Sequence, residues 1–187
     1  MTPPSSPAAP PRAHSLLARA LKLPTALYAA DLGWLLGHRF LALHHRGRRS
    51  GRMYTTVLEV VRWRPDSSEA VVVSGFGPRS QWYRNVLAGG AAEIRIGRRR
   101  FTPEVRALTA QEASAVLADY ERRNRIAAPL VRAVLGRLAG MRYDGSSAAR
   151  AQLVEAIPFI AFTPRPPAAP RPAEADRVSG SSAPRRP

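Results

Sequence analysis

The feature that most constrains this chain is a short basic turn between two strand-like segments. Residues 39–45 have the pattern of a β-strand, and residues 53–63 alternate apolar with other residues and are rich in Thr and Val. Glycines at both sides of the turn permit positive φ and close backbone approach. A hairpin, and with it a sheet-based fold, is therefore predicted around the turn Gly47, Arg48, Arg49, Ser50, Gly51 and Arg52.

The composition of this turn suits a bound phosphate. Its three guanidinium groups, on Arg48, Arg49 and Arg52, would repel one another without an anionic partner. Arginine binds phosphate oxygens bidentately, while the Ser50 hydroxyl and the backbone N–H groups can each donate one hydrogen bond. The alternative is a solvated hairpin loop in an arginine-rich protein. On the residues of the turn alone, both interpretations stay open.

The charge of the whole chain points to an anionic partner. Among 187 residues, 29 are basic and 13 acidic, which gives a net charge of +16. Such a balance is typical of proteins that meet nucleic acid, a membrane surface, or a phosphorylated or carboxylated ligand. The length allows one domain with tails, large enough for a hydrophobic core.

Several chemistries are excluded by what the sequence lacks. There is no cysteine, so disulfides, thiol nucleophiles and thiolate metal sites are absent. The four histidines have no zinc-binding spacing, and the adjacent His44 and His45 should point to opposite faces of a strand. They are interpreted as structural, and no metal site is predicted. No nucleophile elbow, Walker loop or dinucleotide-binding glycine pattern is present.

The chain divides into three parts. Residues 1–14 predict a disordered leader and residues 165–187 a disordered Pro/Arg-rich tail. Residues 15–164 predict one domain that starts with two helices separated by Pro24. These helices are too polar to span a bilayer. They could lie on a membrane surface, although packing against the protein's own sheet is the preferred interpretation.

The order of elements predicts an α+β fold. Strands are expected at residues 39–45, 53–63, 69–74, 92–96, 100–108 and 158–163. Helices are expected at 80–87, 109–125, 129–138 and 146–156, with Ser80, a capping box of Thr109 and Glu112, and Ser146 at their starts. A parallel sheet would need a crossover between every strand pair. About six mainly antiparallel strands in a small barrel with flanking helices are therefore predicted.

A second candidate element follows the third strand. A glycine-rich bend at residues 75–78 leads through Arg79 into a short helix that carries Trp82, Tyr83 and Asn85. Aromatic and amide groups beside a flexible loop can form a platform for a planar ring. Trp82 and Val86 are four residues apart and could instead form the core face of the helix. The residues alone favour the core role for Trp82, and the site role for Tyr83 and Asn85.

These two motifs, in this order and spacing, give the chain a family resemblance. Residues 47–52 followed by 55–58, and then residues 73–77 and 82–85, resemble the deazaflavin-dependent nitroreductase family of actinobacteria. The similarity runs from about residue 27 to residue 164. It implies a split β-barrel and the 8-hydroxy-5-deazaflavin coenzyme F-420, which carries a phosphate and a tail of glutamates.

The resemblance also implies site residues. By family position, Arg48, Arg49 and Ser50 would hold the phosphate, and Arg52 and Arg79 would extend the basic groove. The ring would lie beside Thr55, Thr56, Val57, Leu58, Ser74, Gly75 and Phe76, with Trp82, Tyr83 and Asn85 closing the site. Val57 stands where the family commonly has proline. Tyr143 is the available counterpart of a late substrate-pocket tyrosine, and Tyr83 and Tyr143 are the candidate proton donors.

The implied function is a cytoplasmic reductase in which F-420 delivers a hydride to a small planar electrophile: a quinone, a nitroaromatic or an activated alkene. Flavin mononucleotide (FMN) in a similar barrel, or a tetrapyrrole as acceptor, is a close variant. A nucleic-acid-binding barrel is a second hypothesis, but the arginines are spread through turns, so no specific nucleic acid is expected. Peripheral contact with the inner face of a membrane is a third, compatible hypothesis. The sequence leaves both monomer and homodimer open.

Overall fold

The computed structural model describes residues 33–166. The predicted leader, most of the two N-terminal helices and most of the tail lie outside this range. The described part starts with η1, a 3-10 helix at Gly33–Leu36. Gly37 follows with φ +57°, a left-handed conformation that favours glycine and ends the helical segment.

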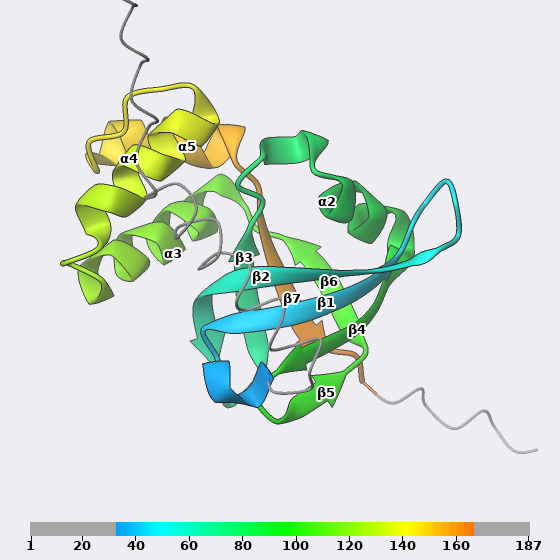
Figure 1. The fold of residues 1–187 in the computed structure, drawn as a ribbon. Helices are drawn as coiled ribbons and strands as arrows, with labels where there is room; N and C mark the ends of the chain where they lie inside the picture. The colour runs from blue at the N-terminus through cyan, green and yellow to red at the C-terminus, as the bar shows by residue number, and fades with distance from the viewer. Residues whose placement is uncertain (1–32, 167–187) are drawn as a thin grey trace, which may run out of the picture.

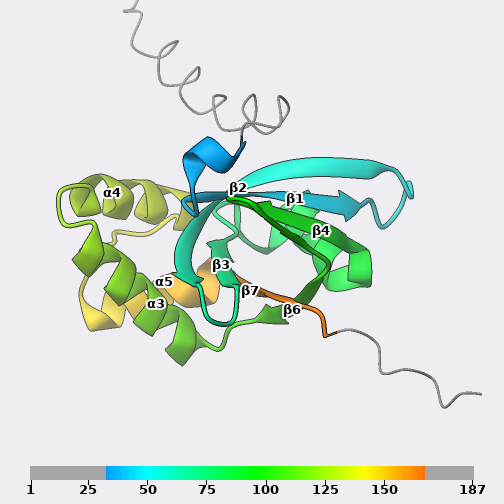
Figure 2. The same ribbon diagram turned by 90° about the horizontal axis from the view of Figure 1, so that it is seen from below.

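Seven antiparallel strands form one sheet that curves into a nearly closed barrel (Figures 1 and 2). Every neighbouring pair of strands is antiparallel, and the spatial order is β5-β4-β1-β2-β3-β7-β6. The two edge strands, β5 and β6, are separated in sequence only by Thr102. The predicted α+β split barrel is confirmed, with strands β1 (Phe40–Arg46), β2 (Met53–Arg64), β3 (Glu69–Val73), β4 (Ala91–Ile96), β5 (Arg99–Phe101), β6 (Pro103–Ala107) and β7 (Phe159–Pro164).

The strand predicted at residues 100–108 proves to be two strands. β5 pairs with β4, whereas β6 pairs with β7 at the opposite edge of the sheet. Pro103 begins β6 and has no N–H to donate, so it stands where one ladder ends and the next begins. The break lets one continuous segment turn the corner of the barrel, which raises the number of strands from the predicted six to seven among the described residues.

Three longer helices lie together at one end of the barrel (Figures 1 and 2), and they are α3 (Ala110–Arg123), α4 (Ala128–Ala139) and α5 (Ser147–Ala156). The predicted caps of α3 and α5 are present: Thr109 and Glu112 form a capping box, and the Ser146 Oγ accepts from an N–H of α5. α4 ends at Gly140, which has φ +69°. Local sequence therefore determines the starts of α3 and α5 and the end of α4.

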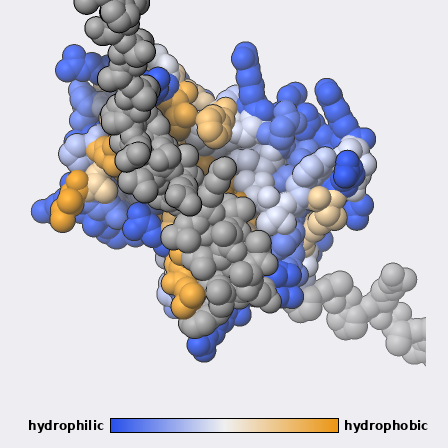
Figure 3. Space-filling model, viewed as in Figure 1, coloured by the Kyte–Doolittle hydropathy of each residue, from blue (hydrophilic) through white to orange (hydrophobic). Residues whose placement is uncertain are grey.

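Two hydrophobic clusters hold the fold. The barrel interior contains alternate residues of the strands, such as Leu41, Leu43 and Phe162. On β3 and β7, the residues that alternate with these interior ones, such as Val71 and Phe159, face outward and pack against α3 and α5. Elsewhere the visible surface is largely hydrophilic, with separate apolar patches (Figure 3). Among the helices described, none is both long and apolar enough to cross a membrane.

The start of α3 is joined to β6 by a charged group, and this gives a pH prediction. Arg106 donates to both carboxylate oxygens of Glu112, at 2.9 and 2.8 Å. These bonds, with the Thr109 N–H, lower the pKa of Glu112 from 4.5 to about 2. Because its folded-state pKa is depressed, the ionised Glu112 carboxylate stabilises the fold fully above pH 4.5. This contribution is lost as the pH falls through 2.

We expect Glu112→Gln to remove part of the acid-induced loss of stability. Denaturant unfolding of wild type and Glu112→Gln between about pH 5 and 2 measures their free energies of unfolding. The difference between these two free energies should shrink as the pH falls. Glu104→Gln, on the exposed side of the neighbouring β6, is the control. A constant difference across this range would contradict the role of the Glu112 carboxylate.

Candidate functional site

The basic turn between β1 and β2 is a closed loop whose glycines are required. The Gly47 N–H donates to the Arg52 C=O, and the Gly51 N–H donates to the Gly47 C=O, both at 2.8 Å. A Cβ on Gly47 would lie 2.7 Å from the Ser50 Oγ and 2.8 Å from the Tyr54 ring. Gly51 has φ +66°, which a side chain disfavours. The predicted hairpin is therefore confirmed, with both glycines in their expected role.

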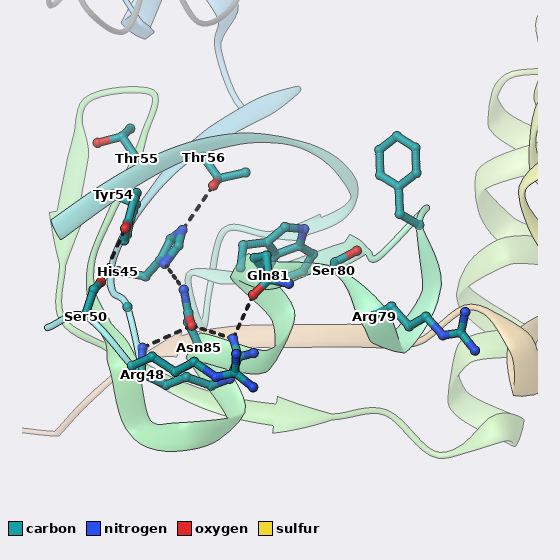
Figure 4. A pocket seen from close by; sticks show the side chains of 14 residues that line it. His45, Arg48, Ser50, Tyr54, Thr55, Thr56, Arg79, Ser80, Gln81 and Asn85 are labelled. Carbon is teal, nitrogen blue, oxygen red and sulfur yellow. Dashed lines mark hydrogen bonds between the residues drawn. The ribbon is translucent and has the colours of Figure 1, made fainter. Parts of the chain in front are cut away.

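A buried amide ties this turn to the helix that follows β3. This helix is α2 (Gln81–Asn85), which continues into η3 (Val86–Gly90). The Asn85 Oδ1 accepts from the backbone N–H of Arg48 at 3.1 Å and from the Arg48 Nη1 at 3.0 Å. The same Nη1 donates to the Gln81 Oε1 at 3.0 Å. Asn85 is 5% exposed, so it holds the turn and the helix together from inside (Figure 4).

His45 extends this connection into the sheet. Its Nδ1 lies 3.2 Å from the Asn85 Nδ2, and its Nε2 lies 3.0 Å from the Thr56 Oγ1 (Figure 4). The imidazole is 3% exposed and stacks on the Tyr54 ring, with centroids 5.9 Å apart. Burial, followed by the charge of His44, lowers the pKa of His45 below 6.5. The ring is therefore neutral at pH 7.

These elements enclose a cavity of about 740 Å³, a size typical of small-molecule and cofactor sites. Three arginines line it, and no lining side chain is acidic. Phe76 and Trp82 add aromatic surface, and Phe76 is 81% exposed. A basic cavity with aromatic walls suits a planar anionic ligand. Its lining residues are His45, Gly47, Arg48, Arg49, Ser50, Tyr54, Thr55, Thr56, Phe76, Arg79, Ser80, Gln81, Trp82 and Asn85.

Many of the predicted site residues meet in this cavity, and others do not. Those in the lining are Arg48, Arg49, Ser50, Thr55, Thr56, Phe76, Arg79, Trp82 and Asn85. Leu58 and Tyr83 instead pack against the barrel core. Ser74 is buried under the bend, where its Oγ donates to the Gly77 C=O at 2.8 Å. Also outside the lining are Arg52, Val57 and Gly75.

Three side chains lie in positions that differ from the expectations drawn from the residues alone. Ser80 precedes α2 but does not cap it, because its Oγ lies 2.9 Å from the buried Ser74 Oγ. The tertiary contact takes the place of the predicted local one. Trp82, for which the residues alone favoured a core role, both lines the cavity and packs against the barrel core. Tyr83, for which they favoured the site, packs against the core only.

Tyr143 is not at the cavity. It is 7% exposed and belongs to the hydrophobic cluster under α3 and α5. Burial, followed by the neighbouring Glu121 carboxylate, raises the pKa of Tyr143 to about 12. The structure therefore places Tyr143 outside the cavity lining, away from the position that its suggested role as a proton donor to a ligand there would require. Its position in the sequence, after α4, gave no indication of this burial.

The sequence analysis missed His45, Gly47, Tyr54, Ser80 and Gln81 as lining residues. One signal for His45 was present. Strand alternation places it on the same face as Leu41 and Leu43, both of which point into the barrel. A histidine on the interior face at the end of a strand, next to a basic turn, is a candidate site residue for that reason.

Comparison with known families decides the classification. Residues 25–130 match the F-420H(2)-dependent quinone reductase family, and this range includes every residue that lines the cavity. The chain belongs to this family. It is thus an oxidoreductase of the group that depends on reduced F-420. The nitroreductase and actinobacterial labels of the resemblance are not part of this match. No curated protein matches the chain.

Several solved structures are similar to this quinone reductase family member. An F-420-H2 dependent reductase is 17% identical, with TM-score 0.40, and covers 67% of this chain and 95% of its own. A protein described as a domain-swapped dimer is also 17% identical, with TM-score 0.41, covering 80% and 95%. A pyridoxamine 5'-phosphate oxidase-related, FMN-binding protein from Nostoc punctiforme is 16% identical, with TM-score 0.37, covering 83% and 82%.

Proposed function

We propose that this chain binds reduced F-420 in the arginine-lined cavity and reduces a planar electrophile, with quinones as the first candidates and nitroaromatics and activated alkenes as others. The observation that carries the proposal is the cavity itself. It brings the basic turn, the start of β2 and α2 together around a volume of about 740 Å³ without a lining carboxylate. An anionic, ring-containing coenzyme matches this charge and shape.

The arginines of the cavity fit the phosphate and the acidic tail of F-420. Arg48 is held against α2 by Gln81 and Asn85, so its position is fixed before any ligand arrives. Within residues 33–166, Arg49 and Arg79 have no hydrogen-bond or ion-pair partner, so their guanidinium groups are available to an anion. Ser50 adds a hydroxyl at the same turn. We assign the phosphate to this turn and the glutamates to its basic surroundings.

The remaining lining residues orient the ring. Reduced F-420, when bound, supplies the hydride. Phe76 and Trp82 offer apolar surface to a planar ring or acceptor, and Thr56 offers a hydroxyl from β2. Because Tyr143 lies in the helical core, we assign the proton that completes the reduction to water entering the cavity. The protein contributes position and charge, not an acid–base pair.

The phosphate assignment predicts the effect of Arg49→Ala. We expect F-420 to bind about tenfold more weakly, because an exposed charge-assisted hydrogen bond is lost, while the fold is retained. Fluorescence titration with F-420 and far-UV circular dichroism measure the two properties. Arg142→Ala, an exposed arginine outside the cavity, controls for the change in net charge. Equal affinity of Arg49→Ala and wild type would reject the assignment.

The same titration with FMN and with a mixed oligonucleotide tests the alternatives. FMN also carries a phosphate, so saturable binding of FMN alone would reassign the cofactor. Binding of the oligonucleotide alone, lost at high salt, would replace the enzyme proposal by the nucleic-acid hypothesis, since each phosphate contact releases counterion. The cytoplasmic location, peripheral contact with a membrane, and the choice between monomer and homodimer stay predictions of the sequence.

A further inference from the structure

A chain of hydrogen bonds beside the cavity has a fixed donor-to-acceptor direction, and it starts at a backbone N–H group. The N–H of Arg48 is a donor in every state of the protein, and it points at the Asn85 Oδ1. The Arg48 Nη1 donates to the same oxygen. Asn85 is therefore oriented with its oxygen toward the turn and its NH₂ group toward His45. If the amide were flipped, its NH₂ group would face the two donors of Arg48, which is unfavourable.

The orientation of Asn85 determines the tautomer of His45. The Asn85 NH₂ group can only donate, so the His45 Nδ1, 3.2 Å away, must be an unprotonated acceptor. The neutral ring then carries its hydrogen on Nε2, which donates to the Thr56 Oγ1 at 3.0 Å. Because that contact occupies a lone pair of Thr56, the hydroxyl hydrogen of Thr56 is directed elsewhere. Thr56 lines the cavity, which gives its hydrogen a place to point.

We propose that His45 is a positioning residue, which holds the Thr56 hydroxyl as a hydrogen-bond donor to an acceptor atom on the ring of the bound coenzyme. The acceptor would be a carbonyl oxygen or an unprotonated ring nitrogen. The inference rests on the proposed function for the identity of the ligand. The hydrogen-bond polarity itself comes from the protein alone.

The groups around His45 oppose its protonation. His44 is its neighbour on β1, Tyr54 stacks on it from β2, and Arg48 approaches the same amide from the turn. None of these is an acid that could pair with an imidazolium. A proton on Nδ1 would also face the Asn85 NH₂ group. Burial and His44 lower the pKa of His45 below 6.5, so the arrangement is stable above that pH and is lost as the pH falls through the folded-state value.

The tautomer can be measured on the full chain without ligand. Nitrogen-15 NMR of the histidine side chains at pH 7 should show His45 with a hydrogen on Nε2 and a bare Nδ1. His45→Phe removes one of the four histidine side chains of the sequence, so the signal that it loses is that of His45. A hydrogen on Nδ1, or an imidazolium, at pH 7 would overturn the proposal.

The F-420 affinities of single and double variants test whether His45 acts through Thr56. We expect His45→Phe and Thr56→Val each to weaken F-420 binding about three- to tenfold at pH 8, the effect of one hydrogen bond. The double variant should bind no more weakly than the weaker single variant, because both changes remove the same contact. Independent effects that add in the double variant would overturn the proposal. His38→Gln, an exposed histidine outside the cavity lining, serves as the matched histidine control and should bind like wild type.

The pH dependence of F-420 affinity distinguishes a positioning role of His45 from a role in packing alone. Wild-type affinity should fall as His45 becomes protonated at a pH below 6.5. His45→Gln should recover at about pH 8 much of the affinity that His45→Phe loses, and it should show no such fall at low pH. A fall of equal size in His45→Gln would overturn the proposal. If wild type binds no F-420 at any pH, the proposed function fails while the tautomer result stands. If wild type binds but every His45 variant binds equally well, only the present inference fails.

Discussion

Gly90→Ala is expected to destabilise the fold by about 3 kcal/mol, the upper range for overpacking a tight site, and to weaken F-420 binding by more than tenfold. A Cβ on Gly90 would lie 2.5 Å from the Arg46 C=O and 2.7 Å from the Asn85 C=O. Both contacts are with backbone, so no side chain can rotate away. The end of η3 would have to move off β1 and carry Asn85 with it. Denaturant unfolding and fluorescence titration measure the two losses.

Gly89→Ala is the control for this prediction. Gly89 has φ +78°, but a Cβ there would meet no atom within 4 Å. Its substitution therefore costs only the left-handed backbone strain, about 1 kcal/mol, and should leave F-420 binding nearly unchanged. Equal losses in the two alanine variants would show that backbone conformation, and not the contact between η3 and β1, limits this position.

Asn85→Leu is expected to weaken F-420 binding about 100-fold, because it removes several buried hydrogen bonds at once. The substitution has similar volume but leaves the Arg48 N–H and the His45 Nδ1 without their partner. The turn then loses its connection to α2, and the Arg48 guanidinium loses one of its two acceptors. Titration with F-420 measures the affinity, and crystallography of the variant would show the displaced turn.

Gln81→Met tests how much the hydrogen bond between Arg48 and Gln81 contributes, apart from the contacts of Asn85. It removes only the second acceptor of the Arg48 guanidinium and leaves Asn85 with its contacts to the backbone and to His45. We expect a loss of affinity below about threefold, since the Arg48 to Gln81 bond is exposed. A loss as large as that of Asn85→Leu would mean that the guanidinium alone, and not the connection between turn and helix, determines binding.

Features that depend on neighbouring residues were predictable from the sequence. The capping box of Thr109 and Glu112 is a contact between residues three apart, and the end of α4 at Gly140 needs only a residue that tolerates positive φ. The hairpin around Gly47 and Gly51 follows from the same logic. The antiparallel barrel also followed, because the expected strands had few helices between them to act as crossovers.

Features that depend on distant partners were not predictable in detail. The division of residues 100–108 into two strands depends on pairing with β4 on one side and with β7 on the other. The hydroxyl of Ser80 is engaged by Ser74 and not by its own helix. Both outcomes are decided by where other segments lie, and local propensity contains no information on that.

The candidate site shows the same division. The basic turn and Asn85 were singled out because their residue types suit anion binding and hydrogen bonding, and the structure places them in one cavity lining. His45 was missed because its role depends on Asn85, forty residues later, and on Thr56 in the adjacent strand. Tyr143 was chosen by family position, yet its ring is needed by the hydrophobic cluster under α3 and α5. Residue type identifies possible chemistry, and the fold decides which residues can use it.

The placement of the helical group has a consequence for how this scaffold can diversify. All cavity-lining residues fall between His45 and Asn85, whereas α3, α4 and α5 form a single excursion between β6 and β7. The excursion leaves and rejoins the barrel at adjacent points, where the Leu108 N–H donates to the Phe159 C=O at 2.9 Å. A different apolar cap could be grafted between these two points without changing a residue of the cavity. One stretch of the chain thus encodes the cavity, and a separate stretch encodes the helical cover.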